Sequence, residues 1–196
     1  MDLITAYFEV ITANWPIWFV TITLIVAAVI DGYELKVPNW ITFPMVISGW
    51  IYSTTFAGVH HDMAWYEGLG WSLAGTVIGL LTLLPLYSIG GMGAGDVKLM
   101  AGIGAWVHVS HTLWAFVYTG LIGAVLAVLM VAFRGAWKKH SMQFVMIAME
   151  ILSVKDPEKL SSIAAARKSS MYLLPYGIPI AIGTIAHFYV NNMLVG

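Results

Sequence analysis

Residues 17–31, IWFVTITLIVAAVID, decide the fold class, because a long apolar run ends abruptly in a carboxylate. A second stretch, GGMGAGDVK at residues 90–98, places another acid behind a series of glycines. A charged side chain is costly at membrane depth, so an ionisable residue there indicates function. The two acids, Asp31 and Asp96, therefore suggest acid–base chemistry if their side chains meet.

The composition is that of a polytopic membrane protein. Of the 196 residues, 60% are hydrophobic and 10% are charged, whereas about a quarter of the residues in ordinary soluble domains are charged. The chain contains no cysteine, which excludes disulfides, thiol nucleophiles and cysteine-based metal sites. We expect no nucleic-acid partner. The glycine-rich stretch matches neither the dinucleotide pattern nor the phosphate loop of nucleotide-binding proteins.

Hydropathy predicts an all-α fold with about six transmembrane helices in a single domain, residues 1–196. The predicted spans are residues 10–31, 39–57, 68–89, 96–109, 111–133 and 171–195. The fourth span is short and is followed by a tight turn near 108–111. From Asp96 to His108 a helix rises only about 20 Å, against roughly 30 Å of hydrocarbon. Either the bilayer thins there, or Asp96 starts its helix below the membrane surface and lines a wet cavity.

The basic residues predict the orientation in the membrane. With six spans, the connections around 32–38, 90–98 and 134–170 share one side, and they hold all nine Lys and Arg residues. By the positive-inside rule this side is cytoplasmic, so both termini are extracytoplasmic and both aspartates face the cytoplasm. Within the cytoplasmic loop at about 134–170, the apolar segment 141–154 is too short to span and is predicted to be an interfacial helix.

Two carboxyl groups about 3 Å apart suit the hydrolysis of a peptide bond. One group removes a proton from water while the other protonates the carbonyl or the leaving amine. Repulsion between like charges keeps one of the two protonated near neutral pH. Glycines before Asp96 would allow close approach of a partner helix and of an extended substrate.

Each of these residues also has a structural alternative. In the structural alternative, Asp31 lies at the membrane–water interface, where carboxylates are common and need no catalytic role. Asp96 would be the N-cap of the fourth helix, and Lys98 would extend its ammonium group to the membrane surface.

Histidines on the opposite side form a weaker constellation. His60-His61-Asp62 and the pair His108 and His111 are a candidate metal site, because histidines three positions apart share a helix face. Exposed loops that contain histidines need no metal, however, and we predict no metal site.

Three segments resemble a known family. Gly93-Ala94-Gly95-Asp96 matches the G-x-G-D signature of membrane aspartic proteases, and its continuation VKLMA at 97–101 resembles the type IV prepilin peptidases. Residues 31–42, DGYELKVPNWIT, are similar to that family's first motif, an aspartate followed by a basic loop and a Pro-Asn step. Residues 175–179, PYGIP, are similar to the start of its last helix. The chain resembles most the short form that serves tight-adherence (Flp) pilus systems.

The resemblance implies an aspartic endopeptidase in the bacterial inner membrane, with its active site toward the cytoplasm. It would cleave the leader from prepilins and pseudopilins, whose apolar N-terminal helix would lie in the lipid bilayer. Asp31 and Asp96 would be the catalytic pair. The supporting motif residues would be Gly93, Gly95, Lys98, Pro38 and Asn39.

Larger, bifunctional members of that family carry zinc-binding cysteines in an additional N-terminal domain and methylate the new amino terminus. This chain has no cysteine, so we expect no cofactor for cleavage, and S-adenosylmethionine only if methylation occurs. A presenilin-like protease is one alternative function, although Ile30 precedes Asp31 where those enzymes have tyrosine. An ion-coupled transporter, with Asp96 as its coupling site, is another.

Overall fold

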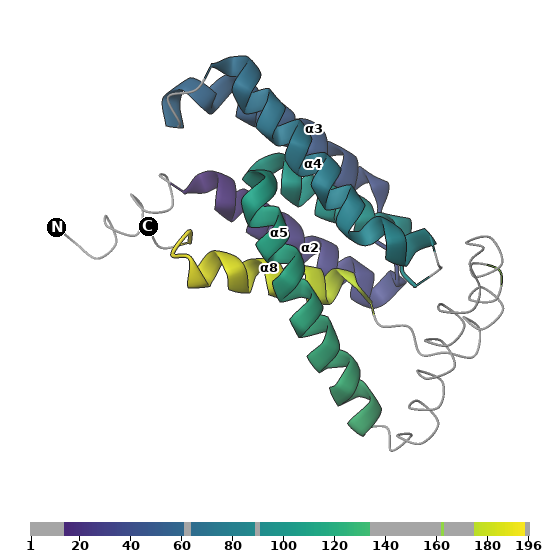
Figure 1. The fold of residues 1–196 in the computed structure, drawn as a ribbon. Coiled ribbons are helices and arrows are strands. Elements are labelled where there is room, and N and C mark those ends of the chain that lie inside the picture. Colours follow the sequence, from purple (N-terminus) through teal and green to yellow (C-terminus); the bar gives the residue numbers. More distant parts are fainter. Residues whose placement is uncertain (1–13, 61–63, 89–90, 134–161, 163–174, 195–196) are drawn as a thin grey trace.

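The computed structural model describes residues 14–60, 64–88, 91–133, 162 and 175–194. Within these ranges every regular element is an α-helix, which confirms the predicted all-α fold (Figure 1). The helices are α2 (Trp15–Glu34), α3 (Asn39–His60), α4 (Trp65–Ser88), α5 (Ala94–Phe133) and α8 (Gly177–Val190).

Three of the described helices, α2, α4 and α5, are long and apolar enough to cross a membrane, and α8 is a shorter apolar helix of 14 residues. This agrees with a polytopic membrane protein, while the number of six spans stays a prediction. The interfacial helix predicted at 141–154 lies outside the described residues, as does nearly all of the loop 134–170.

The fourth and fifth predicted spans form one element, α5, which is interrupted at His108 by non-helical dihedral angles (φ 60°, ψ −172°). A positive φ is unusual for a residue other than glycine, and the break agrees with the turn predicted near 108–111. We call 94–107 the first limb of α5 and 109–133 its second limb.

The first limb lies in the interior of the bundle. Every residue from 99 to 107 is buried, and the limb approaches α4 closely where Gly104 faces Gly75 and where Met100 faces Gly79. A β-carbon at any of these three glycines would overlap backbone atoms of the neighbouring helix. Small residues of this kind let membrane helices pack backbone to backbone, and here they carry Asp96 into the protein.

The connection between α2 and α3 is short. Leu35 adopts a left-handed conformation (φ 54°) that ends α2, and Pro38, immediately before α3, disfavours helical geometry in the residue that precedes it. α2 therefore ends at Glu34, three residues later than predicted, and Asp31 lies within its last turn. α2 and α8 run side by side in opposite directions, so the end of α2 meets the start of α8 (Figure 1).

Candidate functional site

Asp31 is held in the interior by the first residue of α8. Its side chain is only 2% exposed, and its Oδ2 atom accepts a hydrogen bond from the backbone N–H of Gly177 at 2.7 Å. A buried carboxylate is strongly unfavourable unless hydrogen bonds compensate for the loss of water. The start of α8 supplies one such bond.

Asp96 is the third residue of α5 and is 6% exposed. Its Oδ2 atom accepts a hydrogen bond from the backbone N–H of Gly93 at 3.1 Å. An acid at the third helical position that reaches back to the preceding backbone is half of a capping box. The alternative that made Asp96 the N-cap is therefore wrong in position, because α5 begins at Ala94, although Asp96 does cap its own helix.

Asp31 and Asp96 lie near two consecutive residues, Gly177 and Tyr176 respectively, where α8 begins. The Gly177 amide contacts Asp31, while the preceding residue, Tyr176, lies near enough to Asp96 for the carboxylate charge to act on its phenol. On the far side, Gly95 approaches the Val37 carbonyl so closely that a β-carbon at position 95 would overlap it. The C-terminal end of α2 and the N-terminal ends of α5 and α8 thus lie close together.

The supporting motif residues lie around this point. Gly93 donates to Asp96, as described above. Asn39, the first residue of α3, accepts a hydrogen bond from Lys98 Nζ at 2.9 Å. The Lys98 ammonium also lies 4.8 Å from the centre of the Phe43 ring. Lys98 therefore joins α5 to α3, and Pro38 introduces α3.

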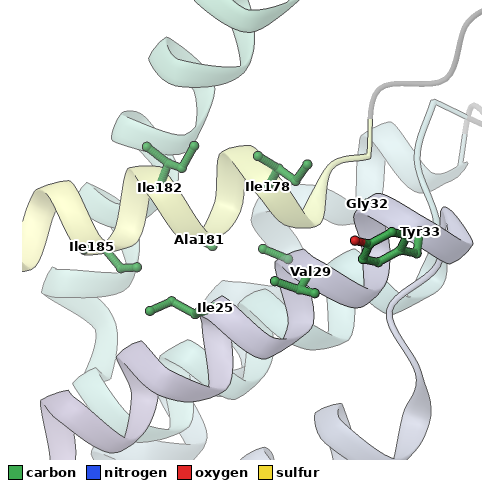
Figure 2. A pocket seen from close by; sticks show the side chains of 9 residues that line it. Ile25, Val29, Gly32, Tyr33, Ile178, Ala181, Ile182 and Ile185 are labelled. Carbon is green, nitrogen blue, oxygen red and sulfur yellow. The ribbon is translucent and has the colours of Figure 1, made fainter.

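An apolar groove of about 450 Å³ opens beside Asp31, between α2 and α8 (Figure 2). Its lining consists of Ile25, Ala28, Val29, Gly32, Tyr33, Ile178, Ala181, Ile182 and Ile185. Gly32 and Ile178, at one end, are the chain neighbours of Asp31 and Gly177. One end of the groove therefore lies at the helix turns that carry Asp31 and Gly177, although neither residue lines it.

The histidines that were considered as a metal site bind different partners. His108 Nε2 lies 3.2 Å from the Ser53 hydroxyl, and His111 Nδ1 lies 3.1 Å from His187 Nε2. Among the residues that the structure describes, no three His, Cys, Asp or Glu side chains form a group able to hold a metal. The side chains of residues 60–62 lie outside the described part.

Tyr176 and Gly177 are the residues to which the sequence assigned no role. The signal was present, because PYGIP at 175–179 was identified as a motif similar to the family's last helix. Nothing in the motif itself shows that it meets Asp31 and Asp96.

The sequence of this chain is similar to those of known proteins. Two similar proteins are named prepilin leader peptidase/N-methyltransferase: one from Aeromonas salmonicida is 25% identical and one from Aeromonas hydrophila is 24% identical, each over 159 residues. The match covers 74% of this chain and 52% of each relative, so the chain spans about half the length of the curated relatives it matches. No solved structure matches.

The family comparison covers the two aspartates of the candidate site. Residues 18–128, more than half of the chain and including both aspartates, match the model of the type IV leader peptidase family. The chain therefore belongs to the type IV leader peptidase family.

Proposed function

We propose that this protein is an aspartic endopeptidase that removes the leader peptide from prepilins and pseudopilins. The observation that carries the proposal is that two buried acids, from α2 and α5, lie where α8 begins: Asp31 accepts a hydrogen bond from Gly177, and Asp96 lies near Tyr176. Membership of the leader peptidase family favours this function over a presenilin-like protease or an ion-coupled transporter.

The chemistry needs only the two carboxyl groups and water. The ionised carboxylate takes one proton from a water molecule, whose oxygen adds to the carbonyl carbon of the scissile peptide bond. The protonated carboxyl gives its proton to the carbonyl oxygen. In the second half of the reaction the carbon–nitrogen bond breaks, and the leaving amine takes up a proton from the pair. We propose no metal or cofactor for this cleavage, which should persist in the presence of EDTA.

Burial supports the division of labour between the acids. Two carboxylates that are removed from water and close to each other cannot both ionise easily, so one proton is shared and the titration belongs to the pair. Backbone N–H groups hold Asp31 and Asp96 in place, and such donors are fixed by the helix ends to which they belong.

We place the acids at the cytoplasmic face of the bacterial inner membrane. Lys98 follows Asp96 by two residues and binds Asn39, and Lys36 lies in the short connection after α2, so both cations stand at the same end of the bundle as the acids. Basic residues of this kind mark the cytoplasmic side.

The groove between α2 and α8 supports a substrate with an apolar helix. Its walls are apolar and one end lies at Gly32 and Ile178, the chain neighbours of Asp31 and Gly177. An apolar segment that enters this groove from the bilayer would bring the adjoining leader junction toward the acids. The two Aeromonas relatives are named as peptidases of prepilin leaders.

The test is cleavage of a purified prepilin in proteoliposomes, followed by a gel shift and mass spectrometry of the product. Asp31→Asn and Asp96→Asn should each lower cleavage by about 10³-fold or more, because each removes an acid or base that no other group replaces. Glu67→Gln is the matched control, because it removes an exposed acid whose contact is local, with the Ala64 backbone. Either aspartate variant with substantial activity would overturn the proposal.

A further inference from the structure

The bond between Gly177 and Asp31 is unusually short for a backbone donor. The N···O distance of 2.7 Å lies at the short end of the range for N–H···O bonds, as charge-assisted bonds to a carboxylate do. Gly177 is the first residue of α8, and the first N–H groups of a helix have no partner within the helix. The donation to Asp31 therefore takes nothing from α8 itself.

Only glycine fits at this position. A β-carbon on residue 177 would lie 2.9 Å from both the Cβ and the Oδ2 atoms of Asp31, closer than real β-carbons approach other atoms. Any side chain at 177 must therefore push the Asp31 carboxyl away or shift the start of α8. Two observations therefore support the contact between Gly177 and Asp31: the short hydrogen bond from the amide, and the absence of space for a side chain.

The rest of α8 is fixed against the second limb of α5. Gly183 lies directly on the backbone at Thr119, and His187 lies 3.1 Å from His111. With its middle and its far end held in this way, α8 presents the Gly177 amide at a set position. A catalytic group must be held within about 0.5 Å of its productive position, which rigid helices achieve better than loops.

We propose that Gly177 is a positioning residue for the reaction, whose backbone N–H fixes the orientation of the Asp31 carboxyl. With Oδ2 engaged by the amide, Oδ1 is the oxygen of Asp31 that is left to exchange a proton with the water or the substrate. This inference rests on the proposed function. It extends the active site to a third helix, because α2 and α5 supply the two acids and α8 supplies the amide that orients one of them.

The direct test is Gly177→Ala, assayed for kcat and KM with a purified prepilin. We expect kcat to fall by about 100-fold, because displacement of a catalytic group by about 1 Å has an effect of this size. KM should change by less than about threefold, because Gly177 acts on Asp31 and not on the substrate. A kcat equal to that of the wild type would overturn the inference.

Two other glycines separate positioning from damage to the fold. Gly120→Ala is the neutral control, because a β-carbon there meets nothing within 4 Å, and it should leave kcat and the melting temperature unchanged. Gly183→Ala should lower the melting temperature, because its β-carbon would overlap the Thr119 backbone. If Gly177→Ala loses activity only in proportion to lost folded protein, as we expect for Gly183→Ala, the positioning role is wrong.

A spectroscopic measurement tests the bond without activity and without a variant at position 177. Tyr176-Gly177 is the only Tyr-Gly step in the sequence, so carbonyl-¹³C tyrosine combined with ¹⁵N glycine selects the Gly177 amide in an NMR spectrum. Asp31→Asn should move this amide proton upfield, because the acceptor loses its charge, whereas Glu67→Gln should not. An unmoved resonance in Asp31→Asn would overturn the inference.

The two proposals fail separately. If Asp31→Asn abolishes cleavage while Gly177→Ala retains full kcat, the aspartic peptidase stands and the positioning role falls. If Asp31→Asn retains cleavage, the peptidase mechanism itself is wrong.

Discussion

The two ends of α8 both carry buried polar contacts, and they are built differently. At the acid end, Asp31 and Asp96 accept hydrogen bonds from backbone N–H groups. At the histidine end, side chains contact side chains: His187 lies 3.1 Å from His111 and 3.0 Å from the amide nitrogen of Asn191.

This difference indicates that the acid end positions the carboxyl groups, whereas the histidine end packs α8 against α5. Backbone donors at helix ends hold the carboxyl groups in set positions and compensate for their burial. The histidine end joins α8 to α5 through side chains. A substitution can remove each of these side chains separately, which is not possible for a backbone N–H. We therefore expect substitutions at the acid end to change catalysis and those at the histidine end to change stability.

The largest contrast between effects on stability and effects on cleavage should come from a comparison of His187→Leu with Asp31→Asn. His187 is buried. Its loss takes the imidazole partner from His111 and one of two contacts from the Asn191 side-chain amide, which should destabilise the protein by about 1–3 kcal/mol. Cleavage per folded molecule should stay within about threefold of the wild type. Asp31→Asn should do the reverse, because asparagine keeps an oxygen that can accept from the Gly177 N–H and avoids the cost of burying a charge.

Thermal unfolding in detergent, with cleavage normalised to the folded fraction, measures both quantities. A His187→Leu protein that is fully stable but inactive would show that the two ends do not have separate tasks.

A smaller effect is expected where the groove meets the acid end. Gly32→Leu adds a side chain to the groove lining, and the first β-carbon has room, because its nearest neighbour, Ile178 Cδ1, would lie 3.7 Å away. We expect KM for a prepilin to rise by about tenfold, which corresponds to about 1.4 kcal/mol of lost binding. Stability should be unchanged or improved, because leucine favours a helix more than glycine does.

Steady-state cleavage over a range of prepilin concentrations gives this KM. An unchanged KM would mean that the substrate reaches Asp31 by another route than the groove.

The smallest effect should come from Lys98→Met. The hydrogen bond from Lys98 to Asn39 is exposed. Even an exposed pair of opposite charges contributes only about 0–1 kcal/mol to stability, so we expect no more from this bond to a neutral amide. Methionine has no cation to place over the Phe43 ring, but its side chain is of similar length and can pack there. We therefore expect less than 1 kcal/mol of lost stability and less than threefold lower cleavage. A loss as large as that of an aspartate variant would instead give Lys98 a direct part in the chemistry.

The sequence predicted those features that follow from local composition. Apolar runs of membrane length indicated α2, α3 and α4. The predicted bounds of α3 and α4 and the predicted end of α2 lie within three residues of those in the structure. The hydropathy pattern also indicated the break near His108. The basic residues placed Asp31 and Asp96 on one side, which agrees with their positions in the structure.

Contacts between distant segments were not predictable in this way. Asp31 and Gly177 are 146 residues apart, and His111 and His187 are 76 apart. Each pair meets only because α8 packs against α2 and α5, and no periodicity in the chain encodes that packing. The motif around Tyr176 was visible in the sequence, but its place beside the acids required the structure.

The most direct test of the central claim, that Asp31 and Asp96 act as one catalytic unit, is a double-mutant cycle on kcat/KM for a purified prepilin. If the acids share one proton and one water molecule, Asp31→Asn, Asp96→Asn and the double variant should lose activity to about the same extent, because either change already disables the unit. Losses that multiply in the double variant, as for independent sites, would contradict the account.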